Sequence, residues 1–216
     1  MKLVALTDIH GAYGRAENIL EKERPDLTII GGDLTTVGSV KEAEEALAHF
    51  RKLTRALFCV AGNMDLPQHD LLFERLDVSL NGRGRIHEGI GFFGLSGAPV
   101  SPLRTPYELS EEVLSARIAE GYRSVKSATK RVFVPHAPPY GTKVDVIHSG
   151  IHVGSTAVRD FIEDHQPDLV ICGHIHESRG EDMLGKTHIV NCGPALKGYY
   201  CVVDFSREIN VEIRKA

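Results

Sequence analysis

Residues 3–10 read Leu-Val-Ala-Leu-Thr-Asp-Ile-His, a short apolar run that ends in two side chains able to bind a metal ion. The arrangement recurs in the second half of the chain, where residues 169–176 read Leu-Val-Ile-Cys-Gly-His-Ile-His. An apolar run of about four to eight residues bounded by Gly or Pro predicts a buried strand. Each of these two strands therefore ends in a pair of candidate ligands.

Three further apolar runs, residues 27–33, 57–63 and 132–136, also end in a metal-binding residue. Ligand-binding groups in open α/β sheets gather at the carboxyl ends of the strands. We therefore expect one convergent metal-binding set with carboxylate, amide and imidazole groups and no thiolate: Asp8, His10, Asp33, Asn63, His136, His174 and His176, with Asp65 just behind. Seven such groups exceed what one divalent ion needs and suit two.

The composition is that of an ordinary globular protein. The chain has 216 residues, of which 42% are hydrophobic and 25% charged, and we expect residues 1–216 to form a single domain. The net charge of -4 and the absence of a Lys/Arg cluster argue against long nucleic acid as a partner. No stretch has the pattern of a signal peptide or a membrane span, so we expect a cytoplasmic protein with no membrane partner.

The four cysteines occur singly, without a Cys-x-x-Cys pair. Cys59 and Cys172 lie inside apolar runs, where a free cysteine behaves as a small buried hydrophobic residue. We interpret all four as reduced and structural.

The order of predicted elements indicates the architecture. Strands near residues 3–7, 27–30 and 56–60 alternate with helices over 15–23 and 40–53, which predicts a largely parallel sheet. Residues 78–95 are broken by glycines and predict antiparallel hairpins. The spacing of Gly89, Gly91 and Gly94 resembles a dinucleotide-binding motif but lies inside a predicted strand, so we reject that interpretation. Beyond these, we expect a surface loop over 96–106, helices over 107–126 and 155–165, a long loop over 135–154, and strands 187–191, 199–205 and 209–214 that complete a second, mostly antiparallel sheet.

Five short motifs occur in a fixed order: Asp8-x-His10, Gly31-Gly32-Asp33, Gly62-Asn63-x-Asp65, His136 and Gly173-His174-x-His176. In this order they resemble the calcineurin-like metallophosphoesterase superfamily. The resemblance extends over nearly the whole chain, into Asn191-Cys192-Gly193-Pro194. It implies an α/β fold, a four-layer α/β/β/α sandwich of two mixed sheets flanked by helices, with a dinuclear metal site at the strand ends.

The resemblance also implies a division of the ligands. One metal would take Asp8, His10, Asp33 and His176, and the other would take Asp33, Asn63, His136 and His174. Asp33 would then bridge the two ions, and a water between them would become the hydroxide that attacks phosphorus. The mixed nitrogen and oxygen ligands favour two divalent ions of Mn, with Fe, Zn, Ni or Co as alternatives.

One position departs from the family pattern. The family usually has histidine after Gly-Asn, where it protonates the leaving group or stabilises charge, and this chain has Met64. Asp65, which supports that histidine in the family, would lose this role. Three outcomes are open: substrates with good leaving groups, a replacement histidine from the 135–154 loop such as His148 or His152, or vestigial hydrolysis. We favour the first two together, and name Asn63, His136 and His152 as candidate catalytic residues.

Two functions are therefore compared. The first is a metal-dependent phosphoesterase, with a small phosphodiester as the favoured substrate. The alternative is a metal-occupied, catalytically weak scaffold that binds a partner protein. The intact ligand set favours the enzyme, and Met64 favours the scaffold. A homo-oligomer could form through a sheet edge or the Phe92-Phe93 region, and nothing in the sequence decides between them.

Overall fold

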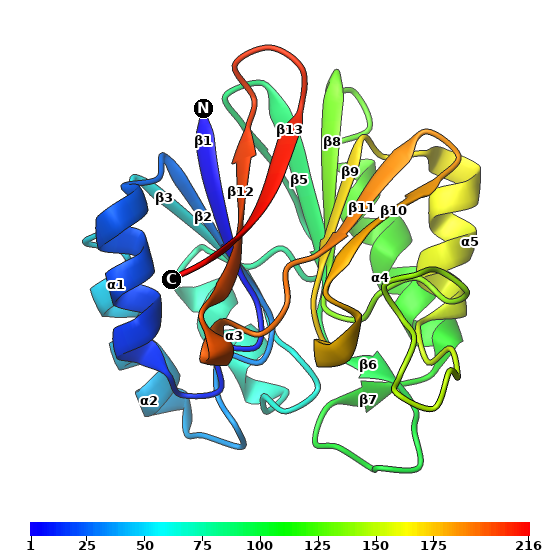
Figure 1. Ribbon diagram of the computed structural model, residues 1–216, viewed down its shortest axis with the longest axis horizontal. Helices are drawn as coiled ribbons and strands as arrows, with labels where there is room; N and C mark the ends of the chain where they lie inside the picture. Colours follow the sequence, from blue (N-terminus) through cyan, green and yellow to red (C-terminus); the bar gives the residue numbers. More distant parts are fainter.

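The computed structural model describes residues 1–216 as two sheets packed face to face, with helices on both outer faces (Figure 1). The first sheet has the strand order β13-β12-β1-β2-β3. Its strands are β1 (Lys2–Leu6), β2 (Leu27–Gly31), β3 (Ala56–Val60), β12 (Tyr199–Asp204) and β13 (Asn210–Lys215). The helices α1 (Tyr13–Glu23), α2 (Val40–Phe50) and α3 (Gln68–Arg75) cover its outer face.

The second sheet has the order β10-β11-β9-β8-β5-β4. Its strands are β4 (Gly84–His87), β5 (Ile90–Leu95), β8 (Lys130–Pro135), β9 (Leu169–Cys172), β10 (Gly180–Leu184) and β11 (Thr187–Asn191). The helices α4 (Glu111–Arg123) and α5 (Thr156–His165) pack on its outer face. Two short strands, β6 (Ala98–Pro99) and β7 (Glu108–Leu109), pair with each other outside the two large sheets. Two 3-10 turns follow β9 and β11, namely η1 (His176–Ser178) and η2 (Ala195–Lys197).

Three apolar layers hold this arrangement together. Along β1, Leu3 and Ala5 face the second sheet, whereas Val4 and Leu6 face the helices, as the two-residue period of a strand requires. All four side chains are fully buried. A third layer lies between the second sheet and α4 and α5. The expected four-layer α/β/β/α sandwich of two mixed sheets is therefore confirmed.

Capping residues explain where two of the helices begin. The Ser39 hydroxyl accepts the Glu42 N–H at the start of α2, and the Ser155 hydroxyl accepts the Val158 N–H at the start of α5. Such a bond satisfies a backbone donor that the first helical turn leaves free. None of the helices is long and apolar enough to cross a membrane.

The expectation for the last three strands was wrong. Instead of completing one antiparallel sheet, β11 pairs in parallel with β9 in the second sheet, whereas β12 and β13 extend the first sheet antiparallel from β1. Alternation of apolar residues identifies a strand but not its partner, because pairing depends on contacts between residues far apart in the sequence.

Other differences are smaller. The helix expected over 107–126 begins only at Glu111, because residues 108–109 pair with β6, and α3 was not predicted. Phe92 and Phe93 are fully buried, one between the sheets and one under the helices, so they cannot form a dimer surface. Gly89, Gly91 and Gly94, whose spacing resembles a dinucleotide-binding motif, lie in the β4–β5 hairpin and not at the start of a helix.

Candidate metal centre

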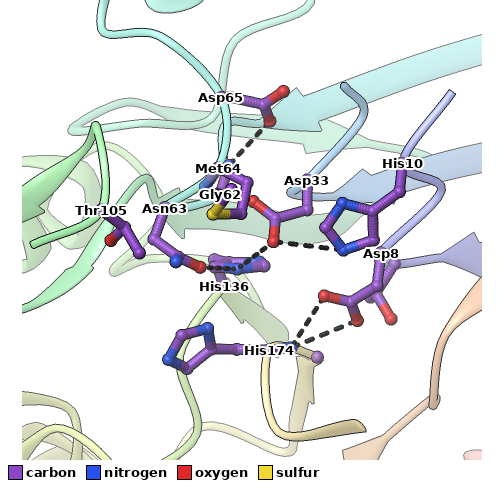
Figure 2. Close-up of polar contacts among 12 residues, drawn as sticks. Asp8, His10, Asp33, Gly62, Asn63, Met64, Asp65, Thr105, His136 and His174 are labelled. Atoms are coloured by element: carbon purple, nitrogen blue, oxygen red, sulfur yellow. Dashed lines mark hydrogen bonds and ion pairs between the residues drawn. The ribbon is translucent and has the colours of Figure 1, made fainter. Parts of the chain in front are cut away.

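All seven predicted ligands follow the carboxyl ends of five strands, β1, β2, β3, β8 and β9, at one edge of the two sheets. Figure 2 shows five of them, Asp8, His10, Asp33, Asn63 and His136, around one space, with His174 beside it. Asp8, Asp33, Asn63 and His136 are buried, and the remaining three are partly buried. The seven residues thus lie at the same edge of the sheets, and their role as metal ligands stays a prediction.

The backbone is unusual at four of these ligands. Asp8, His10, Asp33 and His174 have positive φ angles of 54, 48, 50 and 66°. Asp and His adopt this left-handed conformation more readily than most residues, but it still costs free energy. The turn after each strand is therefore sharp enough to aim the ligand back across the strand end.

Gly32 and Gly62 are required here for space. A Cβ atom on Gly32 would overlap the His136 ring, and a Cβ on Gly62 would overlap the Asp33 carboxylate. Only glycine allows β2 and β3 to end this close to the ligands.

One oxygen of Asp33 lies between two imidazoles. Its Oδ2 is 3.6 Å from His10 Nε2 and 3.5 Å from His136 Nε2. Its other oxygen, Oδ1, accepts the Met64 N–H at 2.7 Å, which fixes the orientation of the carboxylate. Oδ2 is thus presented to both halves of the cluster at once (Figure 2).

On one side of Asp33 lie Asn63, His136 and His174. His136 Nε2 is 3.1 Å from Asn63 Oδ1, and its Nδ1 is 2.9 Å from the Gly31 carbonyl. A donor bond from Nδ1 to a carbonyl leaves Nε2 as the ligand atom. The His174 ring lies beside His136, with 5.1 Å between ring centroids.

On the other side lie Asp8, His10 and His176, whose ligand atoms are all within 4.8 Å of one another. His176 Nε2 is 3.3 Å from Asp8 Oδ1. The His174 N–H donates to both Asp8 oxygens, at 3.1 and 3.2 Å. Asp8 also groups with Asp33 and His136 within the same limit, so both carboxylates border the centre between the two sets.

These groups shift one another's proton affinities. Burial alone would raise the pKa of Asp8, but the hydrogen bond from His176 and the charge of His136 lower it to about 2. Burial would lower the pKa of His136, yet the adjacent Asp33 charge raises it to about 9. Burial and the nearby His136 lower the pKa of His174 to about 3, whereas the bond to Asp8 raises the pKa of His176. Asp8 therefore stays ionised at neutral pH, and an imidazole must give up any proton to bind a cation.

The donor set fits divalent transition metals. It offers two buried carboxylates, one amide oxygen and four imidazoles, and no Lys or Arg forms an ion pair with either carboxylate. Cys172 lies at the end of β9, but burial raises its thiol pKa well above the usual value, and it belongs to neither ligand group. Nitrogen and oxygen ligands without thiolate suit Mn, Fe, Zn, Ni or Co.

Asp65 has a role that the sequence did not indicate. It is fully buried and accepts the backbone N–H groups of Leu34, Thr35 and Gly62 at 2.9 to 3.1 Å, together with the Thr35 hydroxyl. Its carboxylate thereby ties the turn after β2 to the turn after β3. The expectation that Asp65 loses its function with Met64 therefore overlooked this bracing of the Asp33 and Asn63 turns.

His152 lies outside the cluster. Its Nδ1 is 2.7 Å from Oδ1 of the buried Asp145, and no hydrogen bond or ion pair joins it to a predicted ligand. The backbone N–H of His148 donates to Glu177. Of the two loop histidines, only His152 is held by a buried carboxylate.

Thr36 is a contact that the sequence did not reveal. Its hydroxyl lies 2.9 Å from His10 Nδ1, which leaves Nε2 of that ring facing the centre. A lone Thr in a loop carries no sequence signal of this kind. The only available signal was its position three residues after Asp33, in the turn that follows Gly31-Gly32.

Comparison with known proteins agrees with the geometry. The sequence model of the calcineurin-like phosphoesterase family matches residues 1–178. An uncharacterized protein of Methanocaldococcus jannaschii is 34% identical over 204 residues, which cover 93% of this chain and 90% of the relative.

Two solved structures share the fold. A Thermus thermophilus protein superposes with a TM-score of 0.77 at 19% identity, covering 99% of this chain and 98% of that one. A dimetal phosphatase from Danio rerio superposes with a TM-score of 0.72 at 11% identity, covering 100% and 96%. The fold, the strand-end ligands and the match over most of the sequence place this chain in the calcineurin-like phosphoesterase family, as a metal-dependent phosphoesterase.

Proposed function

We propose that the seven clustered side chains bind two divalent metal ions and hydrolyse a small phosphodiester. The observation that carries this proposal is the position of Asp33 Oδ2, which faces His10 Nε2 at 3.6 Å and His136 Nε2 at 3.5 Å. A carboxylate oxygen shared between two imidazole sets is the arrangement that a bridging ligand needs.

The proposed ligand division follows from the two sides of this oxygen. Asp8, His10 and His176 would complete one site with Asp33, and Asn63, His136 and His174 would complete the other. When bound, the two ions would supply an activated water and offset the charge that develops on the phosphoryl group. We propose Mn as the native metal, because the set combines carboxylate and amide oxygens with imidazoles.

The chain's own residues would then orient the substrate. Asn63 and His136 hold each other at 3.1 Å, so the amide and the imidazole are positioned before a substrate arrives. Met64 follows directly and can neither donate a proton nor accept a strong hydrogen bond. Substrates with good leaving groups depend least on that missing proton.

His152 is the residue that we propose as a proton donor for poorer leaving groups. The buried carboxylate of Asp145 fixes its Nδ1, and 39% of the imidazole is exposed, so Nε2 can exchange protons with a substrate. The backbone N–H groups of Gly141, Thr142 and Gly154 hold Asp145 in turn. The loop that carries the pair leaves the sheet directly after His136.

A diester is favoured over a monoester on charge. It carries one negative charge less, so the leaving oxygen departs from a less charged phosphoryl group. With Met64 at the position of the usual acid, that difference favours an aryl or otherwise activated diester.

The test is hydrolysis of bis-p-nitrophenyl phosphate and p-nitrophenyl phosphate by metal-stripped protein, with Mn, Fe, Zn, Ni, Co or Mg added back in turn. We expect turnover that depends on the metal and is faster with the diester. Bound metal without turnover of either ester would contradict the proposal and favour a scaffold that binds a partner protein.

A further inference from the structure

The loop between β6 and β7 is fixed to a metal-ligand segment at both of its ends. The Gly97 N–H donates to the Ala61 carbonyl at 2.9 Å, and the Tyr107 N–H donates to the Asn63 carbonyl at 3.0 Å. Thr105 consequently lies beside Asn63 (Figure 2). Both ends of this loop are therefore held beside the turn that carries Asn63.

A single carboxylate holds the loop in shape. Glu108 accepts the N–H and hydroxyl groups of both Ser101 and Thr105, at 2.7 to 3.0 Å. Burial would raise the pKa of Glu108, but these donors lower it to about 2, so it is ionised at neutral pH. The loop is thus pre-formed, and ordering it on binding would cost little entropy.

This fixed loop exposes apolar side chains. Leu103 is 81% exposed and Val100 is 70% exposed, the two most exposed large hydrophobic residues in the protein. Single exposed hydrophobic residues need no explanation, but two on one rigid loop beside a catalytic centre do.

Val37 approaches the same segment from the other side. Its N–H donates to the Met64 carbonyl at 2.8 Å, the residue is 53% exposed, and its φ is 55°. A β-branched residue in the left-handed region is a genuine outlier, since glycine would adopt that conformation without strain. An exposed valine kept in a strained turn indicates a use for its side chain.

Met64 lies between these two segments, because Val37 bonds to its carbonyl and the β6–β7 loop bonds to the carbonyl of Asn63. Its side chain is only partly buried. We define the rim patch as Val37, Met64, Val100 and Leu103. Within it, Met64 places a thioether where the family pattern has an imidazole.

We propose that the rim patch binds the organic group of the substrate, so that the protein prefers phosphoesters carrying an apolar aliphatic or aromatic group. This inference rests on the proposed phosphodiesterase function and deepens it. A second copy of the chain is the competing occupant. A substrate fits better, because all four residues belong to segments that are bonded to, or contain, the ligand turn at Asn63.

The experiment compares methyl p-nitrophenyl phosphate with hexyl p-nitrophenyl phosphate, which share a leaving group and differ in apolar length. In the wild type we expect kcat/KM to be at least about tenfold higher for the hexyl ester, since part of the added chain leaves water. In the double variant Val37→Gly and Leu103→Ser this ratio should fall to about threefold or less, because only Met64 and Val100 of the patch remain. Val37→Gly also relieves backbone strain, so the melting temperature should not fall.

The matched control is Ile86→Ser. Ile86 is 55% exposed on β4, paired with Gly91 near the beginning of β5, far from the end of that strand where the centre lies. It should keep the wild-type rates and the wild-type ratio.

Three results would overturn the inference. Equal rates for the two esters in the wild type would do so, as would an unchanged ratio in the double variant. A wild-type dimer that becomes a monomer in the double variant, measured by light scattering, would assign the patch to an interface between copies. Failure to hydrolyse even the methyl ester with any metal would instead overturn the proposed function, and the inference with it.

Discussion

The metal-ligand cluster and the loops beside it both contain buried carboxylates, but these carboxylates have different partners. Asp8 and Asp33 face imidazoles, and each accepts the backbone N–H of one residue, His174 for Asp8 and Met64 for Asp33. Asp65 and Asp145 instead accept three backbone N–H groups each, and Asp145 also bonds to His152.

The number of N–H donors therefore distinguishes carboxylates that serve the metal site from carboxylates that stabilise the surrounding turns. A carboxylate saturated with N–H donors stabilises a turn and has little capacity left for a cation. A carboxylate with a single N–H donor and otherwise imidazoles around it repays its desolvation less well, and such residues are retained for function at some cost in stability. The two kinds of carboxylate should therefore respond differently to substitution.

The largest effect is expected for Asp33→Ala. Loss of the shared oxygen should reduce metal-dependent hydrolysis by more than the roughly 10- to 100-fold typical of residues that merely support a ligand. The metal-stripped variant should lose less stability in urea unfolding than a variant of Asp65, because only the Met64 N–H loses its acceptor. Asp160→Ala, an exposed position on α5, is the matched control and should change neither property. A loss of stability as large as that of Asp65→Asn would show that Asp33 stabilises the fold as strongly as Asp65 does.

Asp65→Asn tests whether a carboxylate that accepts several backbone N–H groups stabilises the fold. The substituted amide would point a donor at N–H groups that now bond to oxygen, so we expect a loss of about 3 kcal/mol in the free energy of unfolding. Urea titration against Asp160→Asn measures it. An unchanged stability would show that the turns after β2 and β3 do not depend on Asp65.

Met64→His tests the position between Asn63, a candidate ligand, and Asp65, which holds the neighbouring turns. An imidazole there could donate a proton to the leaving oxygen, so hydrolysis of esters with poor alkyl leaving groups should rise at least about tenfold. Esters of p-nitrophenol should change little. Equal changes for both kinds of ester would indicate that the substitution alters binding rather than proton transfer.

His152→Ala should have a smaller effect of opposite sign. If His152 supplies the proton, the rate should fall about tenfold for poor leaving groups and hardly at all for p-nitrophenol. The dependence of log kcat on leaving-group pKa measures this, with His49→Ala, an exposed helical position, as the control. An unchanged slope would remove His152 from the proposed mechanism.

The smallest effect on activity is expected for Glu108→Ala. Releasing Ser101 and Thr105 should loosen the β6–β7 loop, raise KM a few-fold and leave metal content unchanged. Trypsin should cleave after the exposed Arg104 faster than in the wild type or in Glu45→Ala, an exposed helical control. Resistance equal to that of the wild type would show that Glu108 does not hold the loop.

The position of the candidate ligands at the strand ends could be predicted from the sequence because its signal is local. Each follows an apolar run that identifies a strand, and parallel strands bring their carboxyl ends to one edge. The positions of Asp8, His10, Asp33 and the others therefore followed from strand assignment alone. The sheet order did not, because β11 and β12 have similar apolar patterns yet join different sheets.

The surroundings of the site could not be predicted for a related reason. Glu108 and Asp145 act on backbone groups of their own loops, and nothing in the sequence distinguishes them from solvated carboxylates. Val37 likewise reads as an ordinary valine until its φ of 55° is known. Such roles depend on turn conformation, which short polar segments specify weakly.

The most direct test of the central claim is to soak crystals of the wild-type protein in Mn²⁺ and record anomalous scattering. The account predicts two peaks about 3.5 to 4 Å apart, on either side of Asp33 Oδ2. One peak, or two peaks that do not share Asp33, would contradict a dinuclear centre bridged by this residue.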